Sequence, residues 1–272
     1  MATPKIESET RQHEHEFEIS ASPEEVWRAI TDAAELVNWF PLDAEVQPGP
    51  DGQITYGWGE AFKGSSRILI WEPPSHLKTA WMNDIGPADE HRQQVVVDWF
   101  LEGERGRTRL RLVHSGFGPG QEWDQEYEGT RRGWAFELYS LKNYLEQHRG
   151  RQRQAFWLTK PVPMNDAEVW KRLIGPTGLV RWPDSTAARK GDSIKLELAT
   201  GDRIEGRVLH YLPPVELACT ADNLNHGLFR IGYEDCGSGP VANIWVSVWN
   251  YPEAQFAALK ERLNQHLERA LI

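Results

Sequence analysis

Residues 108–115, TRLRLVHS, and residues 116–145, GFGPGQEWDQEYEGTRRGWAFELYSLKNYL, contain the change of hydrophobic period that decides the fold. In the first segment Leu110, Leu112 and His114 alternate with Arg109 and Arg111. Side chains two residues apart share one face of a strand. This period therefore predicts an antiparallel strand with one buried face.

The second segment follows the period of a helix. Its apolar residues recur at intervals of four, three and four and are Trp134, Leu138, Leu141 and Leu145. This spacing places them on one helical face. We therefore predict a long amphipathic helix from about Trp123 to His148, joined to the strand by the glycine-rich turn Gly116–Gly120.

The segments before this helix predict a short helical region and a run of strands. Ser22 is a favourable N-cap, Pro23 suits the first helical position, and Glu25 completes a capping box. A second short helix is predicted over residues 33–39. The strand-like segments, recognised by alternation, are residues 14–20, 52–58, 66–72, 76–82, 94–101 and 108–115.

The second half of the chain repeats this order. We interpret the polar segment 149–154 as a linker, and a helix is again predicted to start at Asn165. Strands are predicted over residues 155–160, 193–198, 204–211, 215–221, 228–234 and 242–249. The last helix begins near Pro252, and its inner face is Phe256, Leu259, Leu263 and Leu267.

Matching segments support a true internal repeat. Residues 25–28, EVWR, correspond to residues 168–171, EVWK, and residues 71–74, WEPP, correspond to residues 211–214, YLPP. Residues 178–182, GLVRW, mirror residues 35–39, ELVNW, in the second short helix. These segments fall at equivalent places in the two orders. We therefore predict an α+β protein of two domains, residues 1–150 and 151–272.

The composition limits the classes of function. The chain has 272 residues, 40% of them apolar, and a net charge of -10, which argues against binding to nucleic acids and anionic membrane surfaces. No apolar run approaches the ~18 residues of a membrane span, and residues 1–16 lack the apolar core of a secretion signal. We expect a cytoplasmic protein in which Cys219 and Cys236 stay reduced.

The order of elements resembles that of the START-like, or Bet v 1-like (SRPBCC), superfamily, in which a curved antiparallel sheet grips a long C-terminal helix. The first half is similar to the activator of Hsp90 ATPase homologue 1-like family. The segments that carry this resemblance are residues 21–27, ASPEEVW, 39–41, WFP, 70–74, IWEPP, 114–117, HSGF, and 133–134, GW. The resemblance implies two helix-grip domains in tandem.

The second half departs from the family pattern. It has VWNY at residues 248–251 in place of HSGF, and its last helix lacks the Gly-Trp pair, so it looks like a divergent copy. The family's co-chaperone has a separate N-terminal domain for most of its ATPase stimulation. Residues 1–16 cannot replace that domain, so we do not expect the activity in the family name.

The resemblance also implies an apolar ligand cavity between the sheet and the long helix of the first domain. The residues expected to form it are Tyr56, Trp58, Trp81, Trp99, His114, Phe117, Trp134 and Leu138. Aromatic walls with a few polar groups are typical of small-molecule sites. The alternative is that these large rings fill the gap themselves, as many of the thirteen tryptophans would in a core.

Three functions remain open at this stage. The first is a binding protein for a small hydrophobic or aromatic molecule, with no cofactor and no catalytic residue. The second is an aromatase/cyclase-like enzyme in which His114 acts as acid or base, with Tyr56. The third is a chaperone-linked module that binds a protein partner or forms a homodimer. His13 and His15 share a strand face, but no third metal ligand is apparent, and we expect a solvated edge there.

Overall fold

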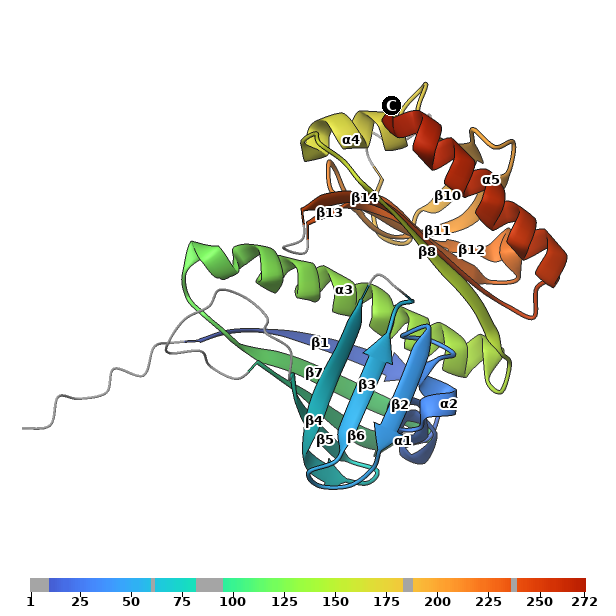
Figure 1. Ribbon diagram of the computed structural model, residues 1–272. Helices are drawn as coiled ribbons and strands as arrows, with labels where there is room; N and C mark the ends of the chain where they lie inside the picture. Colours follow the sequence, from blue (N-terminus) through green and yellow to red (C-terminus); the bar gives the residue numbers. More distant parts are fainter. Residues whose placement is uncertain (1–9, 60–61, 82–94, 183–187, 236–238) are drawn as a thin grey trace, which may run out of the picture. The chain divides into compact units, whose positions relative to one another are not determined.

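The computed structural model describes residues 10–59, 62–81, 95–182, 188–235 and 239–272. The chain divides into two compact units, Met1–Arg149 and Gly150–Ile272 (Figure 1). Cys236 and the predicted strand ends at residues 82 and 94 lie outside the described residues.

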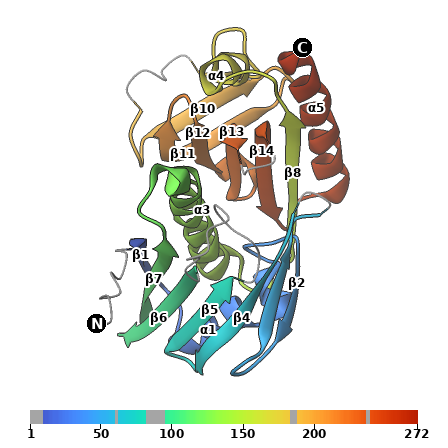
Figure 2. The same cartoon turned by 60° about the vertical axis from the view of Figure 1, so that its left-hand side comes forward.

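The first unit is a seven-stranded antiparallel sheet with three helices, in the strand order β1-β7-β6-β5-β4-β3-β2 (Figure 2). Its strands are β1 (Arg11–Ile19), β2 (Asp43–Gln47), β3 (Gln53–Gly57), β4 (Lys63–Glu72), β5 (His76–Trp81), β6 (Val96–Glu104) and β7 (Arg107–Phe117). Its helices are α1 (Pro23–Thr31), α2 (Ala33–Leu36) and α3 (Asp124–Asn143), which lies across the sheet.

The predicted long helix is confirmed. A single 3-10 turn, η1 (Gln121–Trp123), precedes α3, and a π-helical turn, η2 (Tyr144–His148), continues it to the predicted end. Its buried face includes Trp134, Leu138, Leu141 and Leu145. The change of period in the sequence therefore marks the step from the last strand of the sheet to the helix that covers it.

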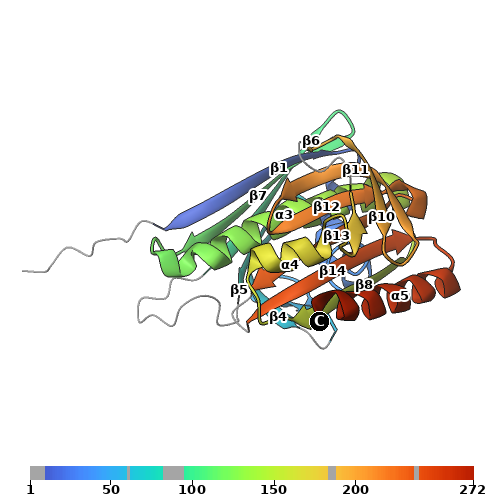
Figure 3. The ribbon, with the colours of Figure 1, turned by 90° about the horizontal axis from the view of Figure 1, so that it is seen from above.

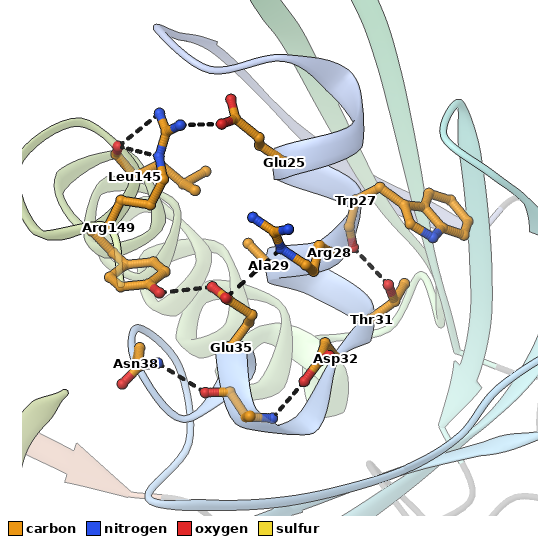
Figure 4. Close-up of polar contacts among 12 residues, drawn as sticks. Glu25, Trp27, Arg28, Ala29, Thr31, Asp32, Glu35, Asn38, Leu145 and Arg149 are labelled. Carbon is orange, nitrogen blue, oxygen red and sulfur yellow. Dashed lines mark hydrogen bonds and ion pairs between the residues drawn. The ribbon is translucent and has the colours of Figure 1, made fainter. Parts of the chain in front are cut away.

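The predicted cap of α1 is also confirmed. Ser22 accepts a hydrogen bond from the backbone of Glu25, and the Glu25 carboxylate accepts one from the backbone of Ser22. Figure 4 shows α1 and α2 beside the C-terminal end of α3, where Tyr144 donates to Glu35 over 2.7 Å. Arg149 contacts both Glu25 and the Leu145 carbonyl there, so it belongs to the end of the helix rather than to a linker.

The second unit repeats the sheet order, as β8-β14-β13-β12-β11-β10-β9 (Figure 3). Its strands are β8 (Arg153–Pro161), β9 (Val180–Arg181), β10 (Ser193–Leu198), β11 (Arg203–Leu212), β12 (Glu216–Ala221), β13 (Gly227–Asp235) and β14 (Pro240–Trp249). Its helices are α4 (Asp166–Leu173) and α5 (Glu253–Leu271), with a 3-10 turn, η4 (Asp222–Leu224), after β12. The predicted inner face of α5 is buried.

The two units share the details that indicated a repeat. The turn between β4 and β5 and the turn between β11 and β12 each contain a cis Pro-Pro bond, Pro73-Pro74 and Pro213-Pro214. In each turn the residue after the second proline donates its backbone N–H three residues back, over 2.8 Å for Ser75 and 2.7 Å for Val215. Each unit also has the same sheet order and ends in a long helix, so two helix-grip domains are present.

Three local expectations were wrong. The segment GLVRW, which mirrors in sequence the ELVNW of the second short helix, instead contains strand β9, which pairs with β10. Strand β2 was not predicted, because Asp43–Gln47 is polar and lies at the edge of the sheet. Strand β8 begins at Arg153, inside the predicted linker, since it pairs with β14 as far as Trp249.

Candidate functional site

An apolar pocket lies between the sheet of the first domain and α3. We call it the domain 1 pocket. The residues that line it are Phe40, Tyr56, Trp58, Phe62, Gly64, Ser65, Ser66, Thr79, Trp81, Val97, Trp99 and Trp134. Seven of these described residues are aromatic, from strands, loops and the helix, and none of the lining residues carries a charge. An uncharged, ring-lined concavity suits a small apolar molecule.

The strand register explains why these side chains converge. Ser66 pairs with Trp81 across β4 and β5, and Thr79 pairs with Val97 across β5 and β6. Directly paired residues project to the same face of a sheet. Trp134 approaches this face from α3, with its ring centroid 5.3 Å from that of Trp99. The pocket is thus the place where the aromatic face of the sheet meets the helix.

The pocket is narrow. Its volume is about 50 Å³. By the same measure, one water molecule needs ~10–15 Å³. An apolar cavity that holds benzene has about 150 Å³. Phe62, a pocket-lining ring, is 44% exposed and packs on Trp58 with centroids 5.6 Å apart. A ring-sized ligand therefore requires a side chain such as Phe62 to move aside.

The pocket lining includes side-chain hydroxyls, among them those of Tyr56, Ser66 and Thr79. Ser66 and Thr79 are buried on the inner face of the sheet. Burial raises the pKa of the Tyr56 phenol, and a hydrogen bond with Ser66 opposes that rise only in part. Tyr56 is therefore a neutral phenol at physiological pH, able to donate or accept one hydrogen bond but unsuited to act as a base.

His114 lies behind the pocket wall rather than in it. Its ring is fully buried in β7, and its Nδ1 accepts a hydrogen bond from Nε1 of Trp134 over 3.0 Å. Burial is the main reason that the pKa of His114 is well below its usual value, with a smaller contribution from His13 and His15. The imidazole is therefore neutral at physiological pH.

The expected solvated edge at His13 and His15 is a further correction. His13 is buried, its Nε2 lies 3.1 Å from the Thr130 hydroxyl of α3, and its ring is 5.2 Å from that of His114. The helix covers the inner face of edge strand β1, and alternation alone did not reveal this. Burial lowers the pKa of His13 to about 3, and it also lowers the pKa of His15. Within the described residues, no group of three His, Cys, Asp or Glu side chains is arranged to hold a metal ion.

The structure brings together five of the residues expected to bind a ligand. Tyr56, Trp58, Trp81, Trp99 and Trp134 line the domain 1 pocket, whereas His114, Phe117 and Leu138 are buried outside its lining. Phe117 packs in a small cluster with Val95 and Trp123. Sequence reasoning missed Phe40, Phe62, Ser66 and Thr79. Alternation from Thr79 to Trp81 could have identified Thr79, but Phe40 and Phe62 lie in connections without a period.

The interior of the second domain is a packed core. Residues from α4, α5 and the sheet form one buried cluster, in which Phe156 and Phe256 pack with centroids 5.0 Å apart. Cys219 belongs to this cluster as a free thiol, and burial raises its pKa. Among the described helices of both domains, none is both long and apolar enough to cross a membrane.

Residues 20–146 match the family model described as activator of Hsp90 ATPase homolog 1-like protein. This match confirms the resemblance that the sequence indicated, and it covers most of the first domain. A search of curated protein sequences finds no match to the chain.

Several solved structures are similar in fold. The Aha1 dimer from Colwellia psychrerythraea is 21% identical with a TM-score of 0.45, and the match covers 52% of this chain and 99% of that one. The di-domain ARO/CYC BexL from the BE-7585A biosynthetic pathway is 14% identical with a TM-score of 0.44, covering 96% and 93%. DynU16 from the dynemicin biosynthetic locus is 16% identical with a TM-score of 0.43, covering 96% and 95%.

Proposed function

We propose that the first domain, which matches the activator of Hsp90 ATPase homolog 1-like family model, binds a small, uncharged aromatic molecule in the domain 1 pocket. The observation that carries the proposal is the ring-lined, charge-free concavity between the sheet and α3. Aromatic side chains such as Trp58 and Trp99 offer faces and edges against which a flat ligand packs.

The absence of charge among the described lining residues defines the class of ligand. A buried carboxylate or ammonium group without a partner costs several kcal/mol or more. The hydroxyls of Tyr56, Ser66 and Thr79 can instead accept or donate one hydrogen bond to a phenol, ketone or indole N–H. A neutral aromatic molecule with one such group therefore fits best.

Catalysis by His114 is not part of this proposal. The ring is outside the pocket lining, and its Nδ1 is occupied by Trp134. A general acid or base has to reach the proton that it transfers, directly or through one water. The second domain is proposed to have a structural role, because its described interior is filled by its own side chains.

The first experiment compares ligands that differ only in charge. Isothermal titration calorimetry at pH 7.5 would be run with p-cresol and indole as neutral probes and with p-toluate as the charged match of p-cresol. We expect saturable binding of the neutral probes and at least tenfold weaker binding of p-toluate. Equal affinity for p-cresol and p-toluate, or no binding of any probe, would refute the proposed ligand class.

A pair of tryptophan variants locates the binding. Trp58 lines the pocket, whereas Trp71 packs against Trp27 with centroids 5.1 Å apart, away from the described lining, and both indoles are partly buried. Trp58→Ala should raise the Kd of indole about three- to tenfold, the loss expected for one aromatic contact. Trp71→Ala should leave that Kd unchanged. The same effect in both variants would place the ligand elsewhere.

A further inference from the structure

One polar contact fixes the ring that forms the helical wall of the domain 1 pocket. The indole of Trp134 donates its only N–H to Nδ1 of His114 over 3.0 Å. Phe40 packs on one side of the indole, with centroids 5.4 Å apart and an interplanar angle of 29°. Trp99 meets it edge-on. Of these three contacts, only the hydrogen bond specifies which way the indole N–H points.

We propose that His114 is a positioning residue for the domain 1 pocket, whose Nδ1 holds the indole of Trp134 in the orientation that forms the pocket wall. This inference rests on the proposed function, since it concerns the wall of the same site. It also assigns a role to a buried histidine that does not touch the pocket.

The hydrogen-bonding chemistry leaves one protonation state. Indole N–H can only donate, so Nδ1 of His114 must carry a lone pair and the ring proton must sit on Nε2. Nε2 is buried, and it has no hydrogen-bond partner within the part of the chain that the structure describes. An apolar side chain of similar size would avoid that unpaired donor. What the imidazole adds at this position is therefore its acceptor, Nδ1.

The ring of His114 is itself held from several elements. His13 of β1 lies directly across the strand pair from His114, and the Trp81 and Phe117 rings contact it with centroids 5.2 and 4.7 Å away. The titratable and charged groups that face this cluster are His13 and His15 on β1 and Tyr127 and Arg131 on α3. The acceptor is therefore fixed in space before any ligand arrives.

The test uses two substitutions that differ in one acceptor atom. His114→Leu removes Nδ1, whereas His114→Asn places an amide oxygen close to the former Nδ1 position. The indole N–H signals of the ¹⁵N-tryptophan-labelled full chain would be recorded by NMR, with Trp134 assigned from its loss in Trp134→Phe. Circular dichroism would confirm that each variant is folded.

We expect the Trp134 indole proton to be shifted downfield in the wild type, to move upfield in His114→Leu and to return in His114→Asn. The Kd of indole should rise about three- to tenfold in His114→Leu and recover in His114→Asn, as expected for one hydrogen bond. A folded His114→Leu protein with an unchanged indole signal and unchanged Kd would overturn the positioning role. So would a folded His114→Asn protein that restores neither.

The outcomes separate the two proposals. If the wild type binds no probe, the proposed function fails, and the indole signal of the free protein still decides whether His114 holds Trp134. If His114→Leu does not fold, Trp134→Phe replaces it, because it keeps a ring and deletes only the donor and the second ring of the indole. An unchanged Kd in that variant would also overturn the positioning role.

Discussion

At the scale of single residues, Glu25 has two structural roles, and its position in a capping box predicts only one of them. Its Oε2 accepts the backbone N–H of Ser22 over 2.9 Å, and its Oε1 pairs with Arg149 from the last turn after α3 (Figure 4). Glu25→Gln should keep the cap and weaken the ion pair, costing under about 1 kcal/mol of unfolding free energy. Glu25→Ala should cost about 1–2 kcal/mol, because the hydrogen bond from the Ser22 backbone N–H to the carboxylate is lost too, although the Ser22 hydroxyl still caps the helix.

Urea denaturation followed by circular dichroism would measure both values. Glu24→Ala is the matched control, since Glu24 precedes Glu25 in the same helical turn but is exposed and outside the capping box. Equal losses for Glu25→Gln and Glu25→Ala would mean that the hydrogen bond from the Ser22 backbone to the residue 25 side chain contributes nothing. The capping box follows from sequence spacing alone, whereas the ion pair joins residues 124 positions apart and needs the folded domain.

At the scale of elements, α3 separates core packing from pocket lining. Leu138 is fully buried and lies outside the lining of the pocket, although Trp134 one turn earlier is part of it. Leu138→Ala should therefore destabilise the protein by about 2–5 kcal/mol, as expected when a buried leucine leaves a cavity. Its Kd for indole, measured at a temperature where the variant is folded, should match that of the wild type.

Guanidinium denaturation gives the stability and calorimetry gives the Kd. A raised Kd in the folded Leu138→Ala variant would place Leu138 in the binding site after all, as the family resemblance implied. Periodicity identifies the buried face of a helix, but both a core leucine and a pocket tryptophan satisfy it. Only the distance to the opposite sheet separates the two, and that distance depends on side chains from other strands.

At the scale of the whole molecule, the sequence predicts the architecture better than the site. The paired segments around Pro73-Pro74 and Pro213-Pro214 predicted two equivalent sheets, because tight turns and strand alternation are local signals. Strand β9 escaped prediction because its pairing with β10 overrides the helix-like appearance of residues 178–182. Burial of His13 escaped as well, since it depends on α3 crossing an edge strand more than a hundred residues away.

Those buried histidines give the first domain a defined response to acid. His13, His15 and His114 all have pKa values below the ordinary value of 6.5, and burial is the largest cause for each. In the unfolded chain each takes up a proton near pH 6.5, so below that pH the unfolded state binds more protons than the folded state. The free energy of unfolding is therefore unaffected by these histidines above about pH 6.5, and it decreases as the pH falls below that value.

Urea denaturation at several pH values between 7.5 and 5.0 would test this response. Each pH unit of fall should cost up to about 1.4 kcal/mol from His114 alone. Carboxylates with lowered pKa values, such as Glu216 at about 2, lose their contribution only below about pH 4.5, so they do not interfere in this range. The His114→Asn variant, which cannot take up this proton, should show a shallower slope. An identical slope in both proteins would mean that His114 takes up its proton as readily in the folded as in the unfolded state, which is incompatible with a buried Nδ1 that accepts the Trp134 hydrogen bond.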